Sequence, residues 1–244
     1  LHFGQILPTM ISFFRENNPI HYLVKDPHKT IFLFYWLDFN FGKSLSHSFF
    51  KNFWILVNIA IILGSVRSDR NGEKVGKWVA KKIESRGHTI MIVDPMQLDL
   101  PILDRMYKEM KNPEPKFQKL QEMILSADGY VPITPEYNHT ISGALKNTLD
   151  YCLEEYFFKP SAIVSYSVGS FGGINAAQHL RQIFAELGSP SIPSSLQISK
   201  VHEIFDDTGT LLSHEYDKRI DRFLDEFDWY LEAFKIQRAN GMPY

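Results

Sequence analysis

From residue 57 onward, short apolar runs alternate with amphipathic stretches, and this alternation most constrains what the chain can fold into. The first run, residues 57–63, is typical of a parallel strand that is buried on both faces of a sheet. The stretch after it, residues 72–85, places its apolar residues at helical spacing. Strand and helix alternating through short connections predict an α/β fold with a doubly wound parallel sheet.

The remaining elements follow from periodicity and from the positions of Gly and Pro. Strands are expected at 57–63, 89–93, 129–133, 162–167 and 191–198. Helices are expected at 72–85, 116–126, 142–154, 173–187 and 213–236, with a short helical turn near 104–110. We expect Trp78, Cys152 and Trp229 to pack in the interior. Five strands favour the flavodoxin-like order 2-1-3-4-5, with helices on both faces, over the six strands of a dinucleotide-binding domain.

Residues 1–55 differ in composition from residues 56–244, which are predicted to form the flavodoxin-like domain. More than half of the 19 Phe residues lie in this N-terminal extension, which we expect to be non-native or poorly ordered. Charged residues interrupt its apolar runs before they reach the roughly 18 to 20 residues that a membrane-spanning helix needs. Three interpretations stay open: a membrane-peripheral or partner-binding extension, a segment packed on the main domain, or an upstream reading frame translated by mistake. We favour the last, with a natural start near Leu56 or Val57.

Composition narrows the class of partner and the compartment. The formal net charge of -2 indicates no polyanion-binding surface, so we expect no nucleic acid partner. A single cysteine, Cys152, excludes an intramolecular disulfide and is typical of a reducing, cytoplasmic location. The histidines lack partners at metal-ligand spacing, so no metal site is expected.

The loop after the first strand is small, hydroxylated and basic, and it leads directly into a helix. A helix start offers unpaired N–H groups and a partial positive charge. Ser65, Arg67 and Arg70 can add side-chain donors to those groups. The loop therefore predicts a phosphate site.

Two further loops are expected at the same edge of the sheet, beyond the carboxyl ends of the third and fourth strands. In the first, Pro135 stiffens the chain, Tyr137 offers an aromatic face and Asn138 offers an amide. Glu136 is expected to shape this loop or to contact a second subunit, rather than to transfer protons. In the second loop, glycines allow backbone N–H groups to approach a flat ligand closely. Together the three loops predict a site for a mononucleotide with a planar base.

Other phosphate-binding classes lack their motifs in this chain. The first loop contains no Cys-x5-Arg nucleophile, no Gly-x4-Gly-Lys-Ser/Thr and no Gly-x-Gly-x-x-Gly. A phosphatase, a P-loop NTPase and a Rossmann dehydrogenase are therefore not expected.

Three motifs carry a resemblance to a known family. They are Gly64-Ser65-Val66-Arg67, then Pro135-Glu136-Tyr137-Asn138 with Gly143-Ala144-Leu145-Lys146-Asn147, then Ser165-Tyr166 with Gly172-Gly173. In order and spacing they resemble the signatures of the NADPH-dependent FMN reductases, which include quinone, azo-dye and chromate reductases. The third loop is longer and bulkier here than in the common form.

The resemblance implies a bound FMN and a role for each motif. Its phosphate would be held by Ser65, Arg67, Arg70, Asn71 and Gly72. The ribityl chain and isoalloxazine would be lined by Pro135, Glu136, Tyr137 and Asn138, and the opposite side of the flavin by Ser167, Gly169 and Gly172.

The resemblance also implies the activity and the assembly. NADPH or NADH would reduce the flavin, and a quinone-like, azo, metal or free-flavin acceptor would then oxidise it in a ping-pong reaction, with no catalytic side chain. A homodimer or homotetramer is implied as well. The alternative is a non-enzymatic FMN-binding electron carrier or redox sensor, and the low overall acidity of the chain favours the reductase.

Overall fold

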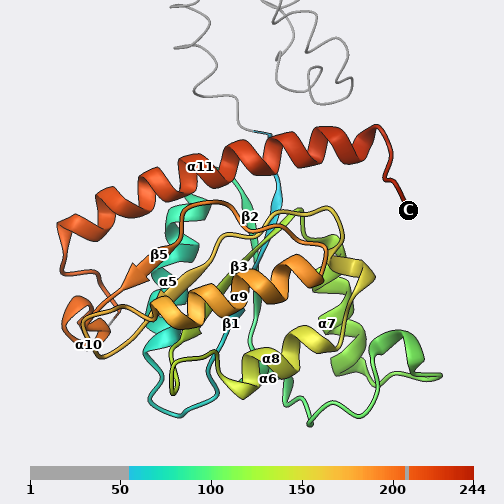
Figure 1. The fold of residues 1–244 in the computed structure, drawn as a ribbon, viewed down its shortest axis with the longest axis horizontal. Coiled ribbons are helices and arrows are strands. Elements are labelled where there is room, and N and C mark those ends of the chain that lie inside the picture. Colours follow the sequence, from blue (N-terminus) through green and yellow to red (C-terminus); the bar gives the residue numbers. More distant parts are fainter. Residues whose placement is uncertain (1–54, 207–208) are drawn as a thin grey trace, which may run out of the picture. The chain divides into compact units, whose positions relative to one another are not determined.

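A five-stranded parallel sheet lies at the centre of the part of the chain that the structure describes, residues 55–206 and 209–244 of a computed structural model (Figure 1). Its strands are β1 (Asn58–Leu63), β2 (Thr89–Val93), β3 (Gly129–Pro135), β4 (Val164–Tyr166) and β5 (Leu196–Ile198). They are all parallel and lie in the order β2-β1-β3-β4-β5. The predicted flavodoxin-like class is confirmed. The predictions for residues 1–54 fall outside the described residues, and the domain boundary near residue 55 stays a prediction.

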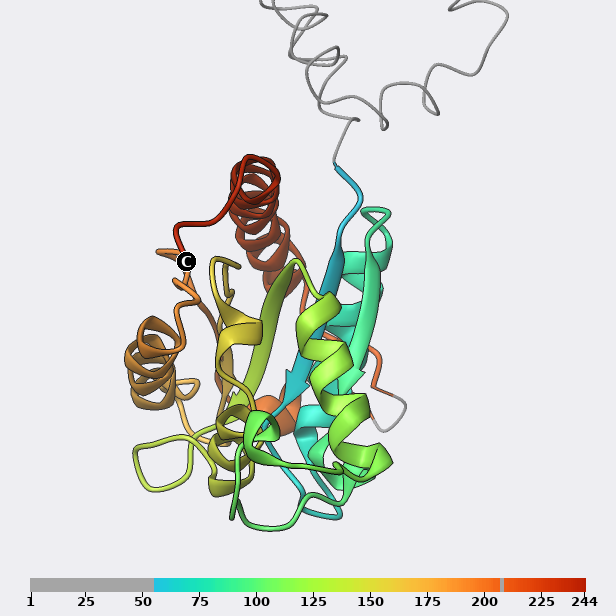
Figure 2. The ribbon, with the colours of Figure 1, turned by 90° about the vertical axis from the view of Figure 1, so that its right-hand side faces the viewer.

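Helices cover both faces of the sheet (Figures 1 and 2). They are α5 (Asn71–Glu84), α6 (Pro95–Leu98), α7 (Pro115–Ser126), α8 (Gly143–Asp150), α9 (Ile174–Glu186), α10 (Val201–Ile204) and α11 (His214–Ala239), with 3-10 turns η1 (Tyr107–Glu109) and η2 (Glu154–Tyr156). Ile59 and Ile61 of β1 pack with α5 and α11 in one core. Ala60 and Ile62, which point to the other face, pack with α7, α8 and α9. All four side chains are fully buried, which is why β1 is apolar on both faces.

The register of the strands brings three loops to one edge of the sheet. Leu63 at the end of β1 pairs with Ile133 of β3, and Pro135 at the end of β3 pairs with Tyr166 at the end of β4. The loops that follow β1, β3 and β4 therefore leave from the same edge, as expected. Figure 2 shows the first two at the lower end of the ribbon, opposite the C-terminus.

Several predicted boundaries differ from the structure. The predicted helix 142–154 is shorter in the structure: it ends at Asp150, and Leu153 has non-helical geometry (φ -140°, ψ -70°) before η2. The predicted strand 191–198 is limited to β5, since Pro193 lacks the N–H that a ladder needs. The short helix α6 was not predicted; the Asp94 carboxylate caps it by accepting from the Met96 N–H at 3.0 Å.

Two of the three expected interior residues are confirmed, and the third prediction is wrong. Trp78 and Cys152 are buried. Trp229, however, is 62% exposed. The buried stripe of α11 consists of Tyr216, Ile220, Phe223, Leu224, Phe227, Asp228 and Leu231. Trp229 lies two positions from Phe227 and from Leu231, so it points away from that stripe.

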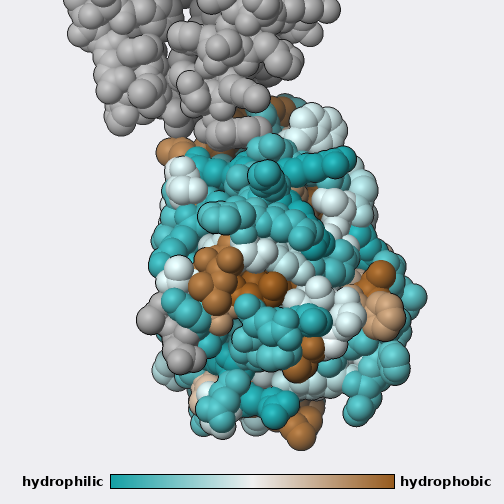
Figure 3. Space-filling view, turned by 90° about the vertical axis from the view of Figure 1, so that its left-hand side faces the viewer, coloured by the Kyte–Doolittle hydropathy of each residue, from teal (hydrophilic) through white to brown (hydrophobic). Residues whose placement is uncertain are grey.

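The described residues on the face drawn in Figure 3 form no continuous apolar band. On the face drawn in Figure 3, hydrophilic residues predominate and hydrophobic ones lie in separate patches. None of the helices between residues 55 and 206 or between 209 and 244 has the length and apolar character needed to cross a membrane. The same residues contain no cluster of three metal-ligating side chains.

Candidate functional site

The end of β1 is hydrogen-bonded to the end of β3. This bond connects the loop after β1, residues 64–70, here called the phosphate loop, to the loop after β3, residues 136–140, here called the aromatic loop. The Gly64 N–H donates to the Ile133 carbonyl at 2.8 Å. A Cβ on Gly64 would lie 2.8 Å from that same carbonyl oxygen, so no side chain fits there. One residue further on, Ser65 Oγ lies 3.0 Å from Tyr137 Oη. Two predicted site residues from different loops are thus in contact.

Helix α5 begins at the phosphate loop without a side-chain cap. Its N-cap residue, Arg70, makes no side-chain hydrogen bond to the N–H groups of the first turn. Arg67 is exposed on the same loop. A helix start that lacks a cap from its own N-cap residue, on a loop that also carries the exposed Arg67, fits an anion such as the FMN phosphate.

Arg70 is held by an acidic residue that the sequence interpretation missed. Its Nη1 and Nη2 atoms donate to the two Asp94 carboxylate oxygens at 2.7 and 2.5 Å, and Nη1 also donates to the Ser65 carbonyl at 2.7 Å. Both side chains are buried. Hydrogen bonding to Asp94 raises the pKa of Arg70, although burial opposes it. Arg70 therefore shapes the loop through Ser65, and its contact with a phosphate stays a prediction. The sequence did contain a signal for this contact. Asp94 directly follows β2, which lies beside β1, so its side chain is expected at the same edge of the sheet as the phosphate loop.

Glu136 fastens the aromatic loop to helix α9. Its carboxylate accepts hydrogen bonds from the backbone N–H groups of Asn175 at 2.9 Å and Ala176 at 3.3 Å, and from the Asn175 side chain at 3.1 Å. A carboxylate at a helix N-terminus is stabilised by the unpaired N–H groups there. This arrangement supports the loop-shaping interpretation of Glu136.

The rest of the aromatic loop is a tight hairpin. The N–H of Tyr137 donates to the Thr140 carbonyl at 2.9 Å, and the N–H of Thr140 donates back at 3.1 Å. Asn138 and His139 between them both have positive φ, 48° and 64°, as a type I′ turn requires. Asn138 is exposed at the tip, while Tyr137 is half-buried and Pro135 is buried at the end of β3.

The loop after β4 is braced against β5. Gly169 accepts hydrogen bonds at its carbonyl from the Ser167 hydroxyl and from the Lys200 N–H, both at 3.0 Å. Gly172 has φ +62°, and a Cβ on it would lie 2.9 Å from Gln197 Cβ. Gly172 is thus needed for packing on β5. The flavin contacts predicted for Ser167, Gly169 and Gly172 stay predictions.

Taken together, a parallel sheet of this order defines a flavodoxin-like protein, and the start of α5 and the aromatic hairpin lie where such folds bind mononucleotides. The family model for NADPH-dependent FMN reductase matches residues 57–203. The chain belongs to this family. It is therefore an oxidoreductase that works with FMN and NAD(P)H, as the motifs predicted.

Individual relatives agree with the family match. An NAD(P)H-dependent FMN reductase from a Nectria species is 36% identical over 136 residues, covering 52% of this chain and 67% of the relative. A quinone reductase from Pseudomonas putida is 28% identical over 189 residues, covering 75% of this chain and 97% of the relative. In fold, the chain resembles the flavoenzyme NAD(P)H:(acceptor) oxidoreductase FerB from Paracoccus denitrificans, with a TM-score of 0.63 at 24% identity over 73% of this chain and 99% of that one.

Proposed function

We propose that the chain binds FMN across the three loops at the carboxyl edge of the sheet and passes electrons from NAD(P)H to a quinone-like or azo acceptor. The phosphate would lie at Ser65, Arg67, Asn71 and Gly72, on the loop that Arg70 holds in shape. Pro135, Glu136, Tyr137 and Asn138 would line the ribityl chain and the ring. Ser167, Gly169 and Gly172 would border its other side.

The observation that carries the proposal is the 3.0 Å contact between Ser65 Oγ and Tyr137 Oη. It joins the loop suited to a phosphate to the loop suited to a planar ring. FMN contains both chemical features, separated by a flexible ribityl chain. A free phosphate would need only the first loop, and an aromatic ligand without a phosphate only the second.

The side chains of the site bind and orient, and FMN supplies hydride acceptance and donation when bound. Glu136 and Arg70 are engaged in fixed contacts with Asn175 and Asp94. We assign no proton-transferring side chain. Because one open flavin face would serve both donor and acceptor, we propose ping-pong kinetics.

The acceptor class is supported by the names of relatives. Besides the Pseudomonas putida quinone reductase, an NADPH azoreductase from Bacillus sp. (strain OY1-2) is 28% identical over 176 residues. Both substrate types are planar, conjugated two-electron acceptors. We propose such an acceptor here.

We also propose that residues 56–244 form the reductase domain, that it works as a homodimer or homotetramer, and that it is cytoplasmic. The one cysteine, Cys152, is buried, so it is poorly placed to bridge two subunits. Sedimentation of the full chain would measure the assembly.

The purified protein tests the proposal directly. Visible flavin absorbance bands that bleach on addition of NADPH and return with a quinone would support it. Parallel double-reciprocal plots would support the ping-pong scheme. Bound FMN with no NAD(P)H oxidation would instead favour an electron carrier, and absence of flavin binding would contradict both.

A further inference from the structure

Tyr166, at the end of β4, reaches the first turn of α5. A Cβ built on Gly72 would lie 2.5 Å from Tyr166 Oη and 3.2 Å from its Cζ atom. No side chain can therefore stand at residue 72 while the hydroxyl is there. The requirement for glycine at this helix start comes from the tyrosine.

The hydroxyl of Tyr166 also faces the phosphate loop. It makes polar contacts with the Gly72 backbone N–H and with the Ser65 side chain. Ser65 in turn contacts the Tyr137 hydroxyl at 3.0 Å. The ends of β1, β3 and β4 thus each contribute one hydroxyl to a single group, which we call the hydroxyl cluster: Ser65, Tyr137 and Tyr166.

Tyr166 is rigidly held and stays neutral. The Glu136 N–H donates to its carbonyl at 3.1 Å, and Gly173 packs against its backbone so closely that a Cβ there would lie 3.0 Å from the Tyr166 N and O atoms. Its side chain is only 5% exposed. Burial raises the pKa of Tyr166, so the phenol remains protonated around neutral pH and adds no negative charge beside a phosphate.

We propose that Tyr166 is a positioning residue for the FMN phosphate. Its hydroxyl holds Ser65 and the first turn of α5 at the separation that the phosphate needs, and this contact favours FMN over riboflavin, which lacks the phosphate. Helix α5 has no side-chain cap of its own, so a support from β4 has a clear physical role. The inference rests on the proposed FMN site.

Tyr166→Phe tests the selectivity, because it removes one oxygen atom and keeps the ring. Flavin-free protein is titrated with FMN and with riboflavin, following quenching of flavin fluorescence. We expect FMN to bind about three- to tenfold more weakly, the size of one lost hydrogen bond, and riboflavin to bind as before. The matched control is Tyr156→Phe. Its hydroxyl is buried and has no partner among the described residues, so the FMN-to-riboflavin ratio should not change.

A second pair of variants tests the geometry. Gly72→Ala should weaken FMN binding and lower Tm in the unaltered background, since the methyl group meets Tyr166 Oη. In the Tyr166→Phe background the oxygen is gone, and the penalty of Gly72→Ala should be clearly smaller. Equal penalties in the two backgrounds would overturn the placement of Tyr166.

The outcomes separate this inference from the proposed function. If the unaltered protein binds FMN and Tyr166→Phe keeps the FMN-to-riboflavin ratio, the inference is wrong and the proposed function stands. If the unaltered protein binds no FMN at all, the proposed function fails and the phosphate role of Tyr166 fails with it.

Discussion

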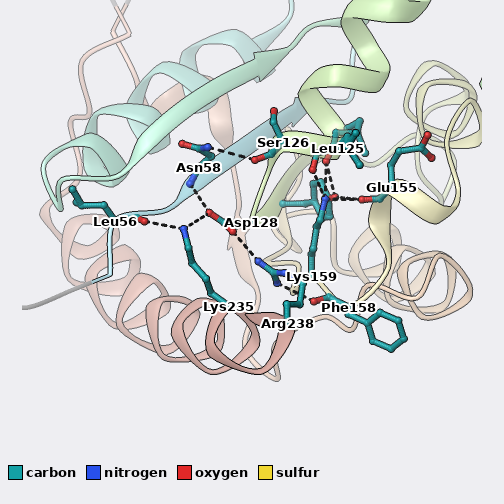
Figure 4. Close-up of polar contacts among 12 residues, drawn as sticks. Leu56, Asn58, Leu125, Ser126, Asp128, Glu155, Phe158, Lys159, Lys235 and Arg238 are labelled. Carbon is teal, nitrogen blue, oxygen red and sulfur yellow. Dashed lines mark hydrogen bonds and ion pairs between the residues drawn. The ribbon is translucent and has the colours of Figure 1, made fainter. Parts of the chain in front are cut away.

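The two ends of the parallel sheet differ in one respect: the carboxyl end combines paired charges, such as Arg70 and Glu136, with an open one. At the amino end, Asp128 precedes β3 and joins it to β1 and α11 (Figure 4). Its carboxylate accepts from the Asn58 N–H at 3.0 Å, from Lys235 at 2.9 Å and from Arg238 at 2.8 Å. At the carboxyl end, the Arg67 guanidinium is exposed and contacts no partner within residues 55–206 and 209–244.

Lys159 is a second charged residue at the amino end whose hydrogen-bond partners all belong to the protein. Lys159 Nζ donates to the carbonyls of Ile124 at 3.2 Å, Leu125 at 2.7 Å and Glu155 at 2.8 Å (Figure 4). An ammonium group has three protons, and all three are used. Charges with a full set of protein partners hold elements together, whereas donors left open at a strand end are available to a ligand.

Loss of Asp128 should have the largest effect, and on stability alone. Asp128→Ala leaves Lys235 and Arg238 without their carboxylate, and we expect the free energy of unfolding to fall by about 3 kcal/mol. FMN affinity, measured well below Tm, should be unchanged. Urea unfolding gives the first quantity and flavin titration the second. Asp225→Ala, at a side chain that is 66% exposed, is the control and should cost under about 1 kcal/mol.

Because Lys159 is buried, the free energy of unfolding should depend on pH in the alkaline range. Burial, with a smaller contribution from Arg238, lowers the pKa of Lys159 to about 8. An unfolded lysine has a pKa near 10.4, so between these values the unfolded chain binds more protons and stability rises with pH. Between pH 7 and pH 9.5, the free energy of unfolding of the unaltered protein should rise by about 2 kcal/mol relative to that of Lys159→Met. The free energies of unfolding are measured with urea at each pH. If they changed with pH in the same way in the two proteins, the prediction of a buried charge at Lys159 would be wrong.

Arg67→Ala should weaken FMN binding and leave the fold intact. Loss of one charge-assisted contact predicts about tenfold weaker FMN, with a free energy of unfolding within about 0.5 kcal/mol of the original. The salt dependence of FMN binding should also decrease. Lys81→Ala, an exposed lysine in the last turn of α5, serves as control. Full flavin occupancy of Arg67→Ala after dilution would show that the phosphate lies elsewhere.

Glu136→Gln should have the smallest effect. The amide keeps one acceptor for the Asn175 N–H but removes the charge at the start of α9, which we expect to cost about 0.5–1 kcal/mol. FMN affinity should fall only slightly, through a looser aromatic loop. Glu186→Gln, at the exposed far end of α9, should be neutral. Loss of NAD(P)H oxidation with FMN still bound would instead indicate a chemical role for Glu136.

The sequence predicted the sheet order and the elements well where the signal is local. The apolar run of β1 and the helical stripe of α5 depend on neighbours within one or two turns of chain, so periodicity finds them. It failed at Trp229, where the expectation followed the aromatic residue type, although the spacing of two positions from Phe227 and Leu231 places this residue on the opposite side of the helix. It also failed for the end of helix 142–154, which stops at Asp150 ahead of the separate turn η2 that carries the buried Tyr156.

The candidate site also contains features that the sequence predicts and features that it does not. The positions of the motifs predicted that Ser65, Arg67, Tyr137 and Asn138 lie at one edge of the sheet. The reason is that the carboxyl ends of parallel strands meet at the same edge. The pairing of Arg70 with Asp94, 24 residues away, has no local signal. Nor does the placement of Tyr166 over Gly72, which depends on the lateral order of β1, β3 and β4.

The fold class, the family and the loops that form the site can thus be predicted from the amino-acid sequence, because they follow from local periodicity and short motifs. Which of those residues are open to a ligand, and which are already engaged by the protein, is visible only in the folded structure. The reason is physical: a side chain's free donors depend on what else the fold brings within about 3 Å of it, and those neighbours come from other strands.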